Sequence, residues 1–196
     1  VLPELSLLLS ESRVGRGYPY TLSYGLKYYF EYIAGFTNLQ QAEGLMSAGY
    51  SVIALLMLII LFIRRRRDFW LKAGAVVFFI FSFVPYFAYM LNGFSYVTNR
   101  WVWAHAMFLG YLVAKIYPCL TELSLRQKQE TVLAAVIISA VSLVIPQLRN
   151  FYTYTSITVL FFACILLIAY DNKGGDGVRL RLGVAVVFMA GLYLMT

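Results

Sequence analysis

Long stretches without charge alternate with short polar segments from residue 44 to the end of the chain. A helix that rises 1.5 Å per residue needs about 20 apolar residues to cross the hydrocarbon core of a bilayer. The pattern therefore predicts about six membrane-crossing helices. They are expected at residues 44–63, 73–91, 101–120, 131–148, 151–170 and 184–196, and the last of them is expected to be truncated.

Two residues inside these apolar stretches need an explanation. Pro85 lies within the second stretch, and a proline removes one backbone N–H and disrupts the helix around it. We expect a kink there, at which a neighbouring helix satisfies the carbonyl group that the proline frees. Lys115 lies near the end of the third stretch, where its ammonium group can reach the membrane boundary.

Residues 1–43 differ in kind from the rest of the chain, because apolar pairs are mixed there with charged residues and tyrosines. This segment is too polar to cross a membrane, and we expect it outside the cytoplasm or at the membrane interface. Within it, residues 2–9 are a candidate for the end of an earlier helix. Residues 22–34 are predicted to form an interfacial helix whose tyrosine rings lie at headgroup depth.

The composition indicates that the solvent of this chain is a bilayer. Of the 196 residues, 61% are hydrophobic and 13% are charged, and the mean hydropathy is +0.74. A water-soluble core cannot bury that much apolar surface. The predicted fold class is therefore all-α, a polytopic transmembrane helix bundle. The chain begins at Val1 and ends inside an apolar stretch, so we expect a fragment of a larger protein.

The net charge of +7 is distributed unevenly over the connectors between the predicted spans. Ten Lys and Arg residues lie in three of them, at residues 64–72, 121–130 and 171–183, against one each at residues 92–100 and 149–154. Cytoplasmic loops are enriched in Lys and Arg, so the first group is predicted to be cytoplasmic. Residues 1–43 and 92–100 are then expected outside. The basic residues form no face with interleaved aromatics on a soluble domain, which argues against nucleic acid as a partner.

Residues 92–101 concentrate polar side chains in a short turn on the predicted outer face. The candidates for substrate contact in this turn are Asn92, Tyr96, Asn99, Arg100 and Trp101. An arginine there can hold a lipid-linked phosphate with two hydrogen bonds, and asparagine or tyrosine can select sugar hydroxyl groups. The alternative is structural: a tight turn at Asn92, a helix cap at Asn99, and an interfacial anchor formed by the last two residues.

His105 is the only histidine, and it lies four residues after Trp101, about 6 Å further along the same helical face. Ionisable groups within a span are candidates for function, so we include His105 in the candidate site. The alternative is a hydrogen bond from His105 to a neighbouring helix. No metal site is predicted, since Cys119 and Cys164 have no second Cys or His at ligand spacing.

The string NGFSYVTNRW at residues 92–101, followed by AHAMFLGYLVAK at residues 104–115, resembles the signature turn of the YfhO-like family of bacterial membrane proteins. The segment LPELSLLLSESR at residues 2–13 is similar to the segment of that family that enters the outer face. Residues 64–67 lie where the family has a basic cytoplasmic connector. The specific part of the resemblance is the turn, and the rest of the chain matches loosely.

The resemblance implies a large glycosyltransferase of the GT-C type in a bacterial cell membrane. Such a protein would move a sugar from a polyprenyl-phosphate-linked donor to a cell-wall polymer such as lipoteichoic acid outside the membrane. The transfer needs a carboxylate to deprotonate the acceptor, and cationic or hydrogen-bonding groups to stabilise the departing phosphate. Tyr96, Asn99 and Arg100 can supply the second part. The carboxylate is expected in an outer loop early in the family's chains, outside this fragment.

Two other functions stay open. A transporter or flippase of lipid-linked sugars would use charged or broken helices at mid-membrane. Pro85 is the one mid-span break, whereas the central parts of the predicted spans carry no charge. A non-catalytic scaffold would need only helices that pack against partner proteins. Membrane lipids are expected partners in all three cases.

Overall fold

The computed structural model describes residues 23–26, 28–29, 32, 35–36, 51–64, 68–94, 101–144, 149, 151–170 and 177–195. Within these residues the chain forms seven α-helices of defined bounds, one 3-10 helix and no strand. In chain order they are α3 (Val52–Ile63), α4 (Phe69–Phe83), α5 (Pro85–Leu91), α6 (Val102–Ile116), η1 (Tyr117–Glu122), α7 (Leu125–Val144), α8 (Phe151–Ala169) and α9 (Gly177–Met195). The predicted all-α class is confirmed.

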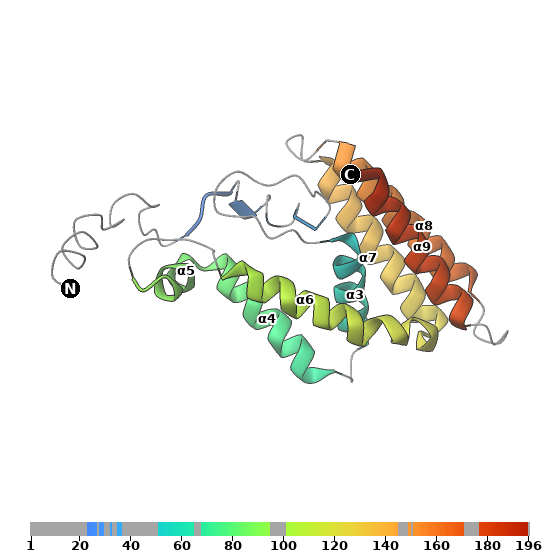
Figure 1. The fold of residues 1–196 in the computed structure, drawn as a ribbon, viewed down its shortest axis with the longest axis horizontal. Helices are drawn as coiled ribbons and strands as arrows, with labels where there is room; N and C mark the ends of the chain where they lie inside the picture. Colours follow the sequence, from blue (N-terminus) through green and yellow to red (C-terminus); the bar gives the residue numbers. More distant parts are fainter. Residues whose placement is uncertain are drawn as a thin grey trace, which may run out of the picture.

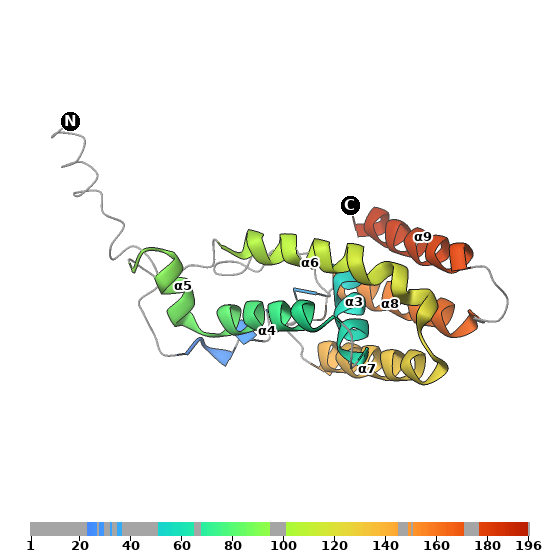
Figure 2. The same cartoon turned by 90° about the horizontal axis from the view of Figure 1, so that it is seen from below.

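The helices form a layer and an arm. Helices α7, α8 and α9 lie side by side in the layer, and α3 packs against α7 and α8 (Figures 1 and 2). The arm consists of α4, α5 and α6. It extends away from the layer, and α5 lies at its outer end (Figure 1). Phe78 of α4 and Phe108 of α6 hold the two long helices of the arm together, with ring centroids 5.0 Å apart.

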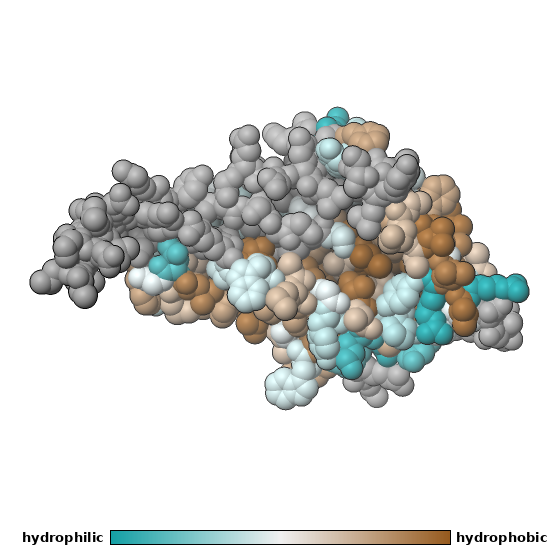
Figure 3. All heavy atoms as spheres, in the orientation of Figure 1, coloured by the Kyte–Doolittle hydropathy of each residue, from teal (hydrophilic) through white to brown (hydrophobic). Residues whose placement is uncertain are grey.

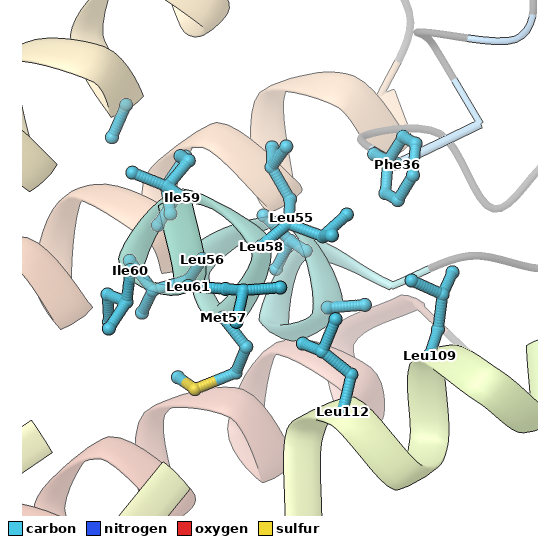
Figure 4. Packing of buried hydrophobic residues seen from close by; sticks show 14 of the residues in the cluster. Phe36, Leu55, Leu56, Met57, Leu58, Ile59, Ile60, Leu61, Leu109 and Leu112 are labelled. Atoms are coloured by element: carbon cyan, nitrogen blue, oxygen red, sulfur yellow. The ribbon is translucent and has the colours of Figure 1, made fainter. Parts of the chain in front are cut away.

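Helix α3 forms the centre of the hydrophobic core. Nine of its twelve residues are buried, and Leu56, Met57, Ile60 and Leu61 are at most 1% exposed. Figure 4 shows these side chains pointing away from the helix in several directions, with Leu112 of α6 beside them. A helix that is apolar on all sides is stable only where neighbours cover it. Helices α6, α7 and α8 provide that cover.

Fewer helices than predicted have the length and composition of a membrane span. Helices α7 and α8 meet both requirements, and α4 with α5 makes a third candidate if the two count as one bent span. Six spans are thus not shown by the described residues. Helix α3 measures only about 18 Å, too short for a hydrocarbon core of roughly 30 Å. Residues 44–50 of the predicted first span lie outside the described residues.

Helices α7 and α9 begin before the apolar stretches that predicted them. Helix α7 begins at Leu125 rather than at residue 131, because Ser124 and Gln127 form a reciprocal capping pair. The Ser124 N–H donates to Gln127 Oε1 at 3.0 Å, and the Gln127 N–H donates to Ser124 Oγ at 3.3 Å. Helix α9 begins at Gly177 rather than at residue 184, and Arg181 Nε donates to the Gly177 carbonyl at 3.2 Å. Polar first turns therefore lengthen both helices.

Candidate functional site

The only histidine lies inside an aromatic cluster in the arm. His105 of α6 is completely buried, and its Nδ1 is 3.3 Å from the Tyr32 hydroxyl group. The Phe78 ring stacks on the imidazole with centroids 5.0 Å apart and planes within 6°. The Phe79 ring meets the imidazole edge-on at 5.9 Å. His105 thus forms its hydrogen bond with the N-terminal segment, and it is closed off from solvent.

A break between α4 and α5 lies beside this cluster, at the proline that predicted a kink. The axes of the two helices differ by 90°, and the residue before Pro85 is extended, as proline requires of its neighbour. The bend deprives the last carbonyl groups of α4 of helical donors. The Tyr28 hydroxyl donates to the Ser82 carbonyl at 2.7 Å, and the Tyr29 hydroxyl donates to the Phe83 carbonyl at 3.2 Å. The predicted kink is confirmed, and tyrosines from outside α4 donate to two carbonyl groups at the end of α4 beside the bend.

These tyrosines belong to an aromatic stripe in the N-terminal segment. Tyr24, Tyr28, Tyr32 and Phe36 recur every four residues, and each is at most 8% exposed. The Tyr24 and Tyr28 rings stack with centroids 3.9 Å apart, and the Tyr32 ring packs edge-on against Phe83 at 4.9 Å. The expectation that the tyrosine rings of this segment lie at headgroup depth stays a prediction, and the rings of the stripe are buried against other parts of the protein. The four-residue spacing was the sequence signal that indicated a buried face.

The predicted substrate turn begins as a tight turn at the end of α5. Asn92 ends the helix, Gly93 and Phe94 have φ angles of 63° and 57°, and the Phe94 N–H donates to the Tyr89 carbonyl at 2.9 Å. Such left-handed conformations reverse the chain within a few residues. The other three candidates of the turn, Tyr96, Asn99 and Arg100, lie outside the described residues.

Trp101 joins the turn to the aromatic cluster. It precedes α6 and is half-buried, and its ring lies parallel to that of Phe78, with centroids 6.4 Å apart and planes within 17°. Phe78 therefore contacts both Trp101 and His105, so these two candidates share a face of α6, consistent with their four-residue spacing. The structure brings together Trp101, His105 and the two residues that the sequence did not single out, Tyr32 and Phe78.

No carboxylate of the described residues lies near this cluster. The Asp and Glu residues that the structure describes are Asp68, Glu122 and Glu130, and all three lie where α3, η1 and α7 meet, away from the aromatic cluster. The described residues also contain no group of three His, Cys, Asp or Glu that could hold a metal ion. The chemistry that these residues support is an imidazole–phenol hydrogen bond within aromatic walls.

The described parts of the predicted cytoplasmic connectors lie away from α5, at the far ends of α4 and α6 (Figures 1 and 2). Arg64 at the end of α3 forms ion pairs with Glu122 at 3.3 Å and with Asp68 at 3.4 Å. Lys128 of α7 donates to the carbonyl of Tyr170, just after α8, at 2.6 Å. Side chains of the connectors thus tie α3, η1, α7 and α8 together at one place.

Comparisons with known proteins identified no relative of this chain. A scan against family models and searches among curated proteins and solved structures found no match. The resemblance carried by residues 92–101 therefore stays a prediction from the sequence.

Proposed function

We propose that this chain is part of a membrane glycosyltransferase of the GT-C type. In this proposal the protein moves a sugar from a polyprenyl-phosphate-linked donor to a cell-wall polymer such as lipoteichoic acid, on the outer face of a bacterial cell membrane. The observation that carries the proposal is the separation of two regions. The turn that begins at Asn92 follows α5 at the tip of the arm, whereas Arg64 pairs with Glu122 of η1, beyond the end of α6 that is far from α5 (Figures 1 and 2). One end therefore suits a lipid-linked substrate and the other suits the cytoplasm.

The residues of the turn would act on the departing phosphate. Arg100 would hold its oxygens with two charge-assisted hydrogen bonds, while Tyr96 and Asn99 would donate to the phosphate or to the sugar. Asn92 and Trp101 would form the two edges of this binding surface. His105 does not touch solvent, so in this proposal it is a positioning residue that holds the start of α6 against α4 through Phe78.

A substitution in the turn tests the proposed transferase. We expect Arg100→Ala in the purified protein, reconstituted with a polyprenyl-phosphate-linked sugar and an acceptor polymer, to lower kcat roughly 100-fold, as loss of one transition-state donor does. Arg149→Ala is the matched control, because Arg149 is a second arginine between predicted spans on the same predicted face. Equal transfer by Arg100→Ala and the unchanged protein would remove the turn from the mechanism.

A second candidate function is transport of a lipid-linked sugar across the membrane. The 90° break between α4 and α5 favours it, because interrupted helices form the binding sites of many transporters. The same reconstituted vesicles distinguish the two functions. A transporter would move a fluorescent lipid-linked sugar between leaflets without any acceptor polymer, whereas a transferase would consume it only when the acceptor is present.

A further inference from the structure

Positive charge is concentrated where the connectors meet. Of the eight Lys and Arg residues that the structure describes, seven belong to this region, which we call the basic end: Arg64, Lys72, Lys115, Arg126, Lys128, Arg179 and Arg181. Arg64 and Lys128 are buried, so five of these cations reach the surface, and the three described acidic residues lie there too. Figure 3 shows hydrophilic residues gathered toward this end of the visible face. The surplus is therefore cationic.

Contacts between elements far apart in sequence make the basic end one surface. Lys72 Nζ donates to the Arg64 carbonyl at 2.5 Å, which joins α4 to the end of α3. The Tyr117 hydroxyl donates to the Arg181 carbonyl, which joins η1 to α9. A Cβ atom added to Gly177 would lie 2.8 Å from Thr121 Cγ2, so the start of α9 is in close contact with η1.

Large apolar side chains stand exposed beside these charges. Each lies in the first two residues of a helix that begins at the basic end: Phe69 (71% exposed) and Trp70 (84%) in α4, Leu125 (65%) in α7, and Val178 (66%) in α9. The Phe69 and Trp70 rings pack edge-on with centroids 5.4 Å apart. Tryptophan with lysine and arginine is the combination that proteins place at a membrane–water boundary. Exposure of such residues to bulk water would be unfavourable.

We propose that the basic end is a docking surface for anionic phospholipids of the leaflet that it faces. The exposed rings of Phe69 and Trp70, with Leu125 and Val178, enter the boundary of the hydrocarbon. The cationic side chains of the basic end that reach the surface, Lys115, Arg126 and Arg179 above all, contact headgroup phosphates. Helices α4, α7 and α9 all begin here, so their N-terminal dipole ends add to the attraction for anions. This surface does not depend on any sugar chemistry at the other end of the molecule.

The mixture of charge and exposed rings selects a lipid over other anionic partners. A nucleic acid would need cations spaced along a groove, whereas here the cations lie at the same end of the helices as exposed apolar side chains in their first turns. The membrane surface offers both features at once, since acyl chains lie directly below anionic phosphates.

The test compares how much phosphatidylglycerol and how much phosphatidylcholine the protein retains after it is purified from nanodiscs that contain both lipids. Phospholipids that stay bound in mild detergent are identified by native mass spectrometry, and we expect phosphatidylglycerol to be retained in preference. Arg126→Gln with Arg179→Gln, both exposed, should reduce that preference about fivefold for each charge removed. Arg149→Gln, the one described basic residue outside the basic end, is the matched control and should leave it unchanged.

Two further measurements use proteins with an intact set of cations. In a Trp101→Phe/Trp103→Phe background, brominated phosphatidylglycerol should quench Trp70 fluorescence more than brominated phosphatidylcholine. Glycerol 3-phosphate, the headgroup phosphate without acyl chains, should not displace the retained lipid. Equal retention by the double variant and the control, equal quenching by both lipids, or displacement by glycerol 3-phosphate would each overturn the proposal.

Discussion

At the scale of single residues, the distinctive feature is how the carbonyl groups at the helix break are satisfied. In a bilayer no water reaches a backbone carbonyl, and each one left without a donor is costly. Ser82 and Phe83 lie where the bend removes helical donors, and phenolic hydroxyl groups of Tyr28 and Tyr29 take their place. The two tyrosines thus stabilise a 90° bend that Pro85 alone would only permit.

A thermodynamic cycle tests this role of the tyrosines. Tyr28→Phe with Tyr29→Phe keeps both rings and removes both donors, so we expect a loss of about 2 kcal/mol in unfolding free energy, roughly 1 kcal/mol per hydrogen bond. In a Pro85→Ala background the helix can continue and supply its own N–H donors. The same two tyrosine substitutions should then lower the unfolding free energy by clearly less. Thermal unfolding in detergent measures all four proteins. Equal losses in both backgrounds would contradict the assignment.

At the scale of elements, glycine decides how closely α8 and α9 pack. The two helices pack side by side (Figure 2). A Cβ atom at Gly191 would overlap the Val159 side chain of α8, and one at Gly183 would lie 3.4 Å from Leu166 Cδ1. Small residues at such interfaces let membrane helices approach until their backbones nearly touch. By contrast, a Cβ atom at Gly110 of α6 meets nothing within 4 Å.

Substitution by alanine should therefore change the stability of the protein differently at Gly191 and at Gly110. Gly191→Ala is expected to destabilise the protein by about 1–3 kcal/mol, because β-branched Val159 cannot turn aside and the helices must separate. Val159→Ala in the same chain should restore most of the loss. Gly110→Ala is the matched control, and it should be neutral or stabilising by up to about 1 kcal/mol through helix propensity. The midpoint of thermal unfolding in detergent is the measurement. A larger loss at Gly110 than at Gly191 would contradict this packing.

At the scale of the whole molecule, polar groups are divided between two ends. The connectors that follow α3, α6 and α8 meet around Arg64, Glu122 and Lys128, while α5 and the turn at Asn92 lie at the tip of the arm (Figure 1). An orientation that puts the basic end in the cytoplasm agrees with the charge bias of membrane proteins. It also puts the predicted substrate turn where a lipid-linked sugar would be used outside the cell.

Cysteine labelling in intact cells tests this orientation. We expect a membrane-impermeant maleimide to label Phe94→Cys and Arg149→Cys from outside, because both belong to turns on the predicted outer face. Glu122→Cys and Val178→Cys lie at the basic end and should be labelled only after the membrane is opened. The background replaces the native thiols at Cys119 and Cys164, and each variant must first be shown to insert. The reverse pattern, or labelling of all four from one side, would contradict the proposed orientation.

The candidate site was predictable only in part. The spacing of Trp101 and His105 put both on one face of a helix, and Phe78 indeed contacts both. The contact between Tyr32 and His105 is not predictable from the sequence, because the two residues are 73 positions apart and no local pattern identifies such a pair. The start of α7 was misplaced for a different reason. The Ser124–Gln127 capping signal is present in the sequence, but it precedes the apolar stretch that predicts the helix from residue 131.

The sequence by itself determined the helical class of the protein, because apolar composition and proline chemistry act locally. Helices form wherever polar backbone groups must be satisfied within a segment, and Pro85 removes a helical hydrogen bond in any context. Only the tertiary structure decided which of the apolar segments are buried in the core. Helix α3 is as apolar as a span, yet nine of its twelve residues are buried by its neighbours. The tyrosines read as interfacial are buried because α4 and α6 offer them carbonyl and imidazole partners. Burial depends on what packs against a side chain, and that is a property of the whole fold.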